Sequence, residues 1–324
     1  MDTELDDILH ESFAEHVRDI KGSYYKGVWL PQDYLKITDD IENFRVRDDD
    51  VWVCSFPRSG TTWTLEMVWC ICNDLNFEKA NKILSTERVF YLEFLGATTA
   101  GISMARKGLA SKLTIDSANR LPSPRFFKSH LPFHLLPKDL RTGNTKAKIV
   151  YITRNVKDVC ISYYHLRKNS KIYCGTFDNY CRLFLENRLA YTPYWNHLIG
   201  YWKAKKSHNI LFLKFEDMKT DLPSVIKSVT RFFNTSLIDK QMEALCDHLS
   251  FHKMQLNPTT NGQIDYKPVL ENCYNIKCSD VAFFIRIGQS DQWKTDMSEE
   301  LIKTFDSWEV ENLKNYPELR THLL

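Results

Sequence analysis

Four short apolar runs, separated by longer stretches with helical character, place the strongest constraint on the fold of this chain. Helical patterns follow the first, third and fourth runs, at 61–75, 156–168 and 224–233. Strands and helices that alternate in this way predict an α/β fold with a central parallel sheet flanked by helices. The four runs, rich in Val, Ile and Phe, are VWVCSF (51–56), RFFKSH (125–130), KIVYITR (148–154) and ILFLKFE (210–216).

The chain shows no internal repeat and no low-complexity linker, so we expect a single domain over residues 1–324. Two long polar stretches, at 96–124 and 257–280, are predicted to be loops. Loops of this length in a compact domain often act as lids over a binding site, and a disordered segment is the alternative interpretation.

The net charge and the cysteine content limit the classes of protein to which this chain can belong. The formal net charge is only +2, whereas a nucleic-acid-binding protein usually carries a larger basic excess, so we expect no nucleic-acid partner. Nine cysteines without a secretory spacing fit a reducing compartment. The acidic start MDTELDDILH is no signal peptide, and no apolar run is long enough to span a bilayer. These features predict a cytoplasmic protein.

The segment SFPRSGTTW (55–63) joins the first apolar run to a helical pattern and has the character of a phosphate-binding loop. It departs from the Walker A motif, because Gly60 is followed by Thr61 where that motif has lysine. Gly60 lets the backbone approach an anion, the helix start and the hydroxyls of Thr61 and Thr62 supply donors, and Arg58 adds a fixed charge. The loop therefore predicts an anion site; a glycine turn with solvated polar groups is the alternative.

Polar side chains also end the second and third runs, and ligands of parallel sheets gather at the carboxyl ends of strands. Lys128 and His130 are two residues apart on a strand, so they should point to the same side. A cation lowers the pKa of a neighbouring histidine, which favours a general base beside a charge stabiliser. Arg154 and Ser162 would similarly hold a second phosphate. A surface lysine with a hydrogen-bonded histidine, and a surface ion pair with a backbone-bonded hydroxyl, are the alternatives.

The pattern lacks the parts of a Walker-type nucleotide hydrolase, which holds Mg²⁺ with a loop hydroxyl and a strand-end aspartate. The only acidic strand end is Glu216–Asp217, and the Walker lysine is missing. We therefore expect a group transfer that requires no metal, in which Arg and Lys side chains supply the positive charge. A nucleotide kinase is the weakest reading of these residues.

Along nearly its whole length the chain resembles the cytosolic sulfotransferases, including arthropod members of the retinol dehydratase type. The resemblance implies a single α/β domain related to the P-loop nucleotide kinases, and 3′-phosphoadenosine-5′-phosphosulfate (PAPS) as the donor, which leaves as PAP. The matching segments, in order, are YKGVWLP, DDDVWVCSFPRSGTTW, RVFYLEF, FFKSHLPFHLLP, KIVYITRNVKDVCISYYH, FLKFEDMKTDLPSVI and FFIRIGQSDQWK.

The resemblance also implies roles for individual residues. His130 would deprotonate the acceptor hydroxyl, while Lys128 and Arg58 would stabilise charge on the transferring group. The acceptor would be a small lipophilic phenol, sterol or other alcohol. The residues implied to bind the donor are Arg58, Ser59, Gly60, Thr61, Thr62, Trp63, Arg154, Ser162, Phe215, Phe251, Arg286 and Gly288. The residues expected to line the acceptor pocket are Tyr91, Phe94, Phe133 and Leu166, and core packing is the alternative for each of them.

The chain departs from the pattern of the family at several positions. Arg58 stands where the family usually has lysine, and an arginine fork does not reach as a lysine does. Phe215 replaces a tyrosine, Leu249 a threonine, and Ile287 the lysine of an Arg-Lys-Gly clamp. The usual dimer segment survives only as Lys294, so we expect a monomer or a dimer through another surface.

Two other outcomes of the same donor site stay open at the level of sequence. One is a PAPS-dependent dehydratase, in which an allylic alcohol such as retinol is sulfonated and then undergoes elimination. The other is a non-catalytic protein that binds PAPS or PAP. Lys128, His130 and Ser162 are intact and favour an active enzyme.

Overall fold

A five-stranded parallel sheet forms the centre of the computed structural model, which describes residues 3–17, 20–107, 113–206, 208–262, 264, 271, 285 and 287–323. All four predicted runs form strands, and one short edge strand, β4, was not predicted. In spatial order the strands are β4 (Phe90–Tyr91), β5 (Phe126–Ser129), β3 (Val51–Cys54), β6 (Lys148–Thr153) and β7 (Ile210–Lys214). A separate antiparallel hairpin pairs β1 (Gly22–Tyr25) with β2 (Val28–Pro31).

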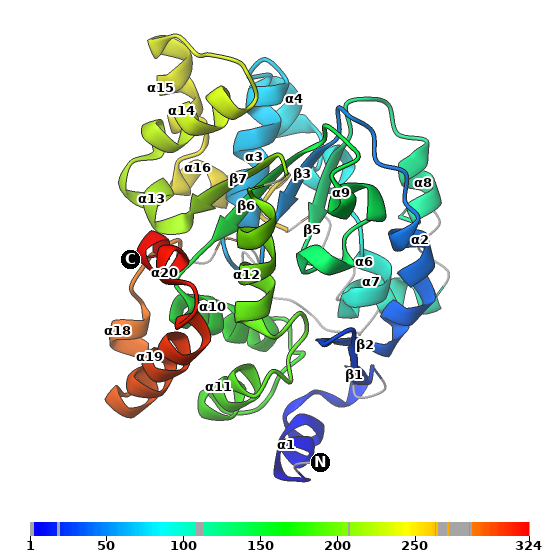
Figure 1. Ribbon diagram of the computed structural model, residues 1–324, viewed down its shortest axis with the longest axis vertical. Helices are drawn as coiled ribbons and strands as arrows, with labels where there is room; N and C mark the ends of the chain where they lie inside the picture. The colour runs from blue at the N-terminus through cyan, green and yellow to red at the C-terminus, as the bar shows by residue number, and fades with distance from the viewer. Residues whose placement is uncertain are drawn as a thin grey trace.

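Alternate residues of β3 face opposite sides of the sheet, as the two-residue period of a strand requires. Trp52 and Cys54 belong to one buried apolar cluster, and Val51 and Val53 belong to the other. Both faces of the central strand are therefore buried, which explains why its sequence is apolar throughout. Figure 1 shows helices covering the sheet on both sides.

The helices predicted after three of the strands are confirmed to within a few residues. They are α3 (Thr61–Cys72) after β3, α10 (Val156–Asn169) after β6, and the pair α13 (Phe215–Thr220) and α14 (Leu222–Phe232) after β7. Phe215 and Glu216 were predicted to end the last strand, but they begin α13 instead. At their carboxyl ends, β5 and β6 are one residue shorter than the apolar runs, and β3 and β7 are two residues shorter.

The prediction of a loop over 96–124 was wrong for most of its length. The described residues contain three short helices, α6 (Phe94–Ala97), α7 (Thr99–Arg106) and α8 (Ile115–Asn119). The helix α7 buries Ala100 and Ile102, and the Thr114 side chain caps α8 by accepting from the Ser117 N–H. Most of the stretch 257–280, also predicted to be a loop, lies outside the described residues.

The remaining helices surround this core. Figure 1 places α11, α18 and α19 below the sheet, beyond α10, and α14–α16 at the opposite end. None of the helices in the described part of the chain combines the length and the apolar character needed to cross a bilayer. The helices whose bounds are not given above are α1 (Thr3–Ser12), α2 (Thr38–Glu42), α4 (Phe77–Lys82), α5 (Ser85–Arg88), α9 (Lys138–Thr142), α11 (Phe177–Leu185), α12 (Tyr194–Ala204), α15 (Asp239–His248), α16 (Phe251–Leu256), α18 (Trp293–Asp296), α19 (Glu299–Leu313) and α20 (Pro317–Leu323). Turns of 3₁₀ helix lie at Glu15–Val17, Gln32–Ile37 and Phe133–Leu135.

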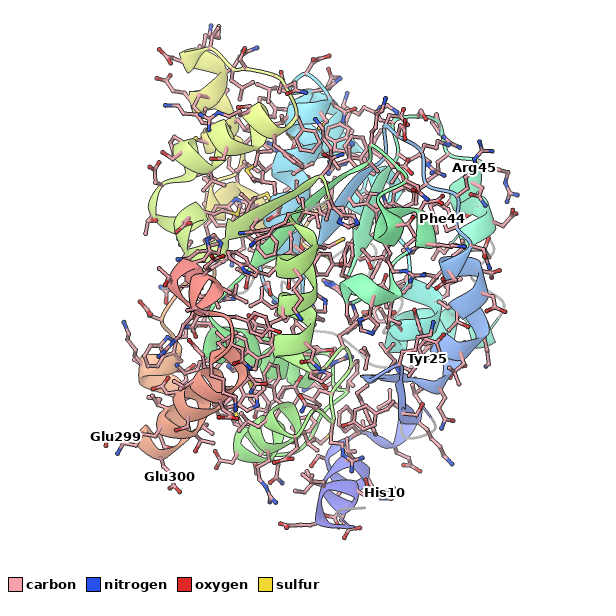
Figure 2. The ribbon with its side chains drawn as sticks, in the orientation of Figure 1. His10, Tyr25, Phe44, Arg45, Glu299 and Glu300 are labelled. Carbon is pink, nitrogen blue, oxygen red and sulfur yellow. The ribbon has the colours of Figure 1, made fainter. Side chains whose placement is uncertain are left out.

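Side chains fill the space between the sheet and its covering helices. Phe44 packs its ring against Trp52 and Phe127 at centroid distances of 6.3 and 5.3 Å. In Figure 2, Phe44 lies inside the outline of the molecule, whereas Glu299 and Glu300 lie at its lower rim. These ring contacts belong to the apolar cluster on the Trp52 face of the sheet.

Candidate active site

A cavity of about 1140 Å³ opens at the carboxyl ends of β3, β5 and β6. In the strand order, the connection that follows β3 leads to β4 at one edge of the sheet, and the connection that follows β6 leads to β7 at the other edge. Crevices of this kind are where open parallel sheets bind their ligands. The cavity is lined by the loop at 57–62, by the strand-end residues Lys128, His130 and Arg154, and by side chains from α3, α10 and α13.

The loop between β3 and α3 is shaped by two residues with positive φ. Gly60 has φ +107°, and a Cβ at this position would lie 2.7 Å from Cδ2 of Phe215. Arg58 has φ +73°. The hydroxyl of Thr61 is 2.7 Å from the Ser55 Oγ, which ties the helix start to the strand end. The loop therefore packs directly on an aromatic ring at its glycine. Ser59 is buried and does not line the cavity formed by the described residues.

Two arginines lie at this loop: Arg58 belongs to it, and Arg154 reaches it from the end of β6. The Arg58 Nε donates to the Ser162 Oγ over 3.1 Å. Arg154 donates to the Gln289 carbonyl oxygen over 2.8 Å, and its guanidinium lies 4.4 Å from the centroid of the Phe215 ring. All of these residues but Gln289 line the cavity, so fixed positive charge and a hydroxyl gather at one end of it.

Aromatic side chains form the next part of the wall. The rings of Trp63 and Phe215 are 5.7 Å apart, edge to face, and the Trp63 indole donates to the Leu249 carbonyl oxygen over 2.9 Å. Gly288 has φ +61°, and a Cβ there would lie 2.4 Å from the Phe251 ring. At Gly60 and at Gly288 an aromatic ring therefore occupies the position that a side chain would take. Arg286, expected to bind the donor, lies outside the described residues.

His130 is buried at the end of β5 and is held by the backbone of Ser55. Its Nδ1 donates to the Ser55 carbonyl oxygen over 2.8 Å, and the Ser55 Oγ lies 3.2 Å from the same nitrogen. Burial, and then the positive charge of Lys128, lower the pKa of His130 well below its ordinary value. The imidazole is therefore neutral near physiological pH, with the Nε2 unprotonated.

Glu93, which the sequence analysis did not single out, accepts hydrogen bonds from His130 and from the residue before it. Its carboxylate accepts from the His130 backbone N–H over 2.6 Å and from the Ser129 Oγ over 2.9 Å. Burial raises the pKa of Glu93 from 4.5 to about 7, and these hydrogen bonds oppose the rise. An acidic residue inside the apolar segment RVFYLEF was the signal available in the sequence.

Aromatic rings surround the imidazole on its cavity side. Tyr91 and Tyr191 present their rings to His130 at centroid distances of 5.5 and 5.7 Å, and their hydroxyls are 3.0 Å apart. The Lys128 Nζ lies 4.3 Å from the centroid of the Tyr91 ring. Phe94 and Leu166 also line the cavity, as expected, whereas Tyr191 was missed.

The position of Phe133 contradicts the expectation that it lines the acceptor pocket. It does not line the cavity formed by the described residues, and its ring packs against Tyr201 and His208 at 5.5 and 5.1 Å. A 3₁₀ turn at Phe133–Leu135 follows His130, and it directs this side chain to α12.

One group of side chains in the described residues has ligand types that a metal ion could use. Glu66, Cys70 and His248 offer atoms within 4.8 Å of one another. The Glu66 carboxylate, however, already pairs with Arg88 at 2.7 Å and with the His248 Nε2 at 2.8 Å. Both Arg88 and Glu66 are almost completely buried, so this group acts as an internal ion-pair network.

Comparisons with known proteins agree with this geometry. A family model described as "Sulfotransferase domain" matches residues 48–317. Luciferin sulfotransferase of Photinus pyralis is 36% identical over 85% of this chain and 74% of that protein, and amine sulfotransferase of Oryctolagus cuniculus is 34% identical over 87% of each. A crystal structure of retinol dehydratase in complex with androsterone and inactive cofactor PAP superimposes with a TM-score of 0.83 and 29% identity, covering 97% of this chain and 95% of that one. This chain therefore belongs to the sulfotransferase family.

Proposed function

We propose that the protein transfers a sulfuryl group from PAPS to the hydroxyl of a small lipophilic acceptor, with His130 as the general base. The observation that carries the proposal is that one cavity contains both an anion-binding loop and a neutral histidine with an unprotonated Nε2. Aromatic rings beside that nitrogen suit an apolar phenol or alcohol.

The residues at the arginine end of the cavity fit the donor. Arg58, Arg154 and Ser162 gather charge and a hydroxyl where phosphate groups would lie, and the start of α3 adds backbone N–H groups. The aromatic rings of Trp63, Phe215 and Phe251, which line the same cavity, suit a flat base. PAPS, when bound, supplies the sulfuryl group and leaves as PAP.

At the other end, the chain positions a proton acceptor and a cation. The His130 Nε2 takes the proton of the acceptor hydroxyl, which is a poor nucleophile until that proton leaves. Lys128 lines the cavity on the same edge of the sheet, where its charge stabilises negative charge that develops on the transferring group. Glu93 holds the His130 backbone and so fixes the base relative to the strand.

The departures from the family pattern alter this site without removing its chemistry. Arg58 keeps a positive charge in the loop and uses its Nε on Ser162. Phe215 keeps the ring that faces Gly60 and Arg154 while losing a hydroxyl. Ile287 lines the cavity in place of a cation, which leaves more of the phosphate binding to Arg154 and to the loop.

A second candidate is dehydration of an allylic alcohol through sulfonation and elimination. The specific observation that favours it is the likeness of the whole chain to retinol dehydratase, at a TM-score of 0.83. Both reactions use the same donor site, so they differ in what happens to the product. We further propose a cytoplasmic location, in keeping with the cytosolic sulfotransferases that the sequence resembles.

The experiment is a screen with radiolabelled PAPS against phenols, sterols, retinoids and catechols, followed by mass analysis of the products. Sulfate esters would support transfer, and an alkene with free sulfate would support the dehydratase. Binding of PAP without turnover of any acceptor would instead identify a non-catalytic donor-binding protein.

A further inference from the structure

Two tyrosines that flank His130 on its cavity side form a hydrogen-bonded pair. Tyr91 belongs to the short edge strand β4, and Tyr191 lies in the segment before α12. Their hydroxyl oxygens are 3.0 Å apart, and both residues line the cavity. Each ring meets the imidazole edge to face, at centroid distances of 5.5 and 5.7 Å. The pair therefore bounds the same part of the cavity as the base.

The backbone holds both tyrosines in place. Tyr91 lies opposite Lys128 in the register of β4 and β5, and the Lys128 Nζ is 4.3 Å from the centroid of its ring. The Tyr191 N–H donates to the Trp29 carbonyl oxygen over 2.8 Å. Tyr191 is buried and has φ +73°, in the left-handed region that bulky residues seldom adopt. Backbone conformations of this kind cluster at active sites and at sites that hold ligands.

The pair has one more O–H group than its mutual hydrogen bond uses. Burial raises the pKa of both phenols well above the ordinary value, so both are neutral and each carries its proton. One proton forms the bond between the two oxygens, and either tyrosine can be its donor. The other proton has no acceptor among the described residues. Because both side chains line the cavity, this second O–H is placed to donate to a molecule bound there.

We propose that the pair Tyr91–Tyr191 donates a hydrogen bond to a second oxygen of the acceptor, so that the preferred substrate carries an ether, carbonyl or hydroxyl oxygen close to the hydroxyl that reacts at His130. The proposal rests on the function proposed above and specifies a substituent of the acceptor. Phe94 and Leu166 contribute apolar wall to the same cavity, and against such a wall an oxygen loses its hydrogen bonds to water without replacement. The tyrosine pair supplies a donor for one such oxygen.

The test compares methoxyphenols with ethylphenols, which have nearly the same size and differ by an oxygen in place of a methylene. Ortho, meta and para isomers vary the distance between that oxygen and the reacting hydroxyl. For each isomer, the measured quantity is the ratio of kcat/KM for the methoxyphenol to kcat/KM for the ethylphenol. The two phenols also differ in acidity and hydration, but these differences are the same for every variant and cancel when the ratios are compared.

The double variant Tyr91→Phe with Tyr191→Phe removes both hydroxyls and keeps both rings on His130. We expect it to lower the ratio by about 3–10-fold for at least one isomer, the usual contribution of one neutral hydrogen bond. If the tyrosines only hold the base in position, kcat/KM falls by the same factor for both phenols. An unchanged ratio for all three isomers would overturn the proposal. Should the double variant fail to fold, the two single variants replace it, and an unchanged ratio in both would be equally decisive.

Tyr201→Phe is the matched control, because it removes a buried phenol hydroxyl that lies near the base but outside the cavity wall. This hydroxyl donates to the carbonyl oxygen of Leu131, the residue after His130, over 2.8 Å. Tyr201 does not line the cavity formed by the described residues. The ratio for Tyr201→Phe should equal that of the intact protein, whatever happens to kcat. An equal fall of the ratio in the control and in the double variant would contradict the proposal.

Binding separates this inference from the activity itself. If no acceptor is turned over, the proposed function fails, and calorimetry with methoxyphenols and ethylphenols in the presence of PAP then decides the inference. A ratio of the two binding constants that falls in the double variant would still support a hydrogen bond from the tyrosine pair. The same ratio in the intact protein and the double variant, for every isomer, would reject it.

Discussion

The Nδ1 of His130 donates a hydrogen bond to the carbonyl oxygen of Ser55 over 2.8 Å. A carbonyl oxygen can only accept, so the proton of the neutral ring lies on Nδ1 and the lone pair lies on Nε2. Ser55 is also the first residue of the segment 55–63, which is proposed to bind the donor. One peptide group therefore connects the orientation of the base to the loop that would hold the donor.

Replacing His130 tests the role of this base. We expect His130→Ala to lower kcat by about 10²–10⁴-fold with an aliphatic alcohol, the usual worth of general-base catalysis. The loss should be smaller with an acidic phenol, because such a hydroxyl ionises without help. Steady-state kinetics with both acceptors would check this. PAP affinity, measured by calorimetry, should persist because Arg58 and Arg154 would hold the phosphates; near-normal kcat with the alcohol would remove His130 from the mechanism.

The buried carboxyl of Glu93 makes the stability of the protein depend on pH. Its pKa is raised from 4.5 to about 7 by burial, so between these values the folded state binds a proton that the unfolded chain has lost. The contribution is fully present below about pH 4.5 and is lost as pH rises through about 7. The loss is on the order of 3 kcal/mol.

Glu93→Gln isolates this effect, because glutamine resembles the protonated acid and does not titrate. The difference in unfolding free energy between the intact protein and the variant should fall across that pH window in urea denaturation experiments. His130 is present in both proteins, so its own titration largely cancels. Parallel pH profiles for the two proteins would show that Glu93 keeps an ordinary pKa.

Arg154 should contribute to binding of the donor more than to binding of the acceptor. Its guanidinium packs on Phe215 at the end of the cavity that holds the loop at 57–62. Loss of one charge-assisted contact in Arg154→Ala should cost about 1.5–3 kcal/mol in PAP affinity. Arg120→Ala is a suitable control, since that side chain is exposed and pairs with Asp116 on the surface. Equal PAP affinity in both variants would contradict the assignment.

The strands β3 and β6 were predictable because they are buried on both faces of the sheet, apart from Lys148, which gives a nearly continuous apolar sequence. The strand β7 shows a similar apolar run, although four of its five residues are only partly buried. The helix α7 was not predictable, because it is short and Gly101 interrupts its sequence TAGISMAR. A Cβ at Gly101 would lie 1.9 Å from the Phe94 carbonyl oxygen, so the glycine permits close packing on α6. A tertiary contact of this kind leaves no period in the sequence.

Residues of the site could be predicted where they lie at, or soon after, the end of a predicted strand. Lys128 with His130, and Arg154 with Ser162, lie next to predicted strands, and the parallel sheet brings both pairs to one cavity. Tyr191 comes from the segment before α12, and only the folded chain places it beside His130. The expectation for Phe133 was wrong, because this residue begins a 3₁₀ turn that directs its side chain away from the cavity, although it lies close to His130 in the sequence.

Metal independence is a prediction about turnover. The loop lacks a Walker lysine, and the cavity gathers Arg58, Lys128 and Arg154 where charge would develop. We expect the rate with excess EDTA to match the rate in buffer alone, measured with PAPS and any acceptor found by the screen. An EDTA-inhibited enzyme whose rate returns on addition of Mg²⁺ would show that a cation takes part.

Gly60→Ala tests whether the close packing of the loop on Phe215 matters for the donor. A Cβ at Gly60 would lie 2.7 Å from that ring, and the backbone there has φ +107°. Alanine in such a conformation costs about 1–2 kcal/mol, and the clash would also displace the loop or the ring.

Gly27→Ala is the matched control, because Gly27 has φ +80° and no atom within 4 Å of the added Cβ. Both variants should lose stability in thermal unfolding, but only Gly60→Ala should lose PAP affinity, by about 10-fold or more if one phosphate contact is broken. Equal PAP affinity in the two variants would mean that the loop tolerates a side chain at Gly60 and that the donor does not depend on this packing.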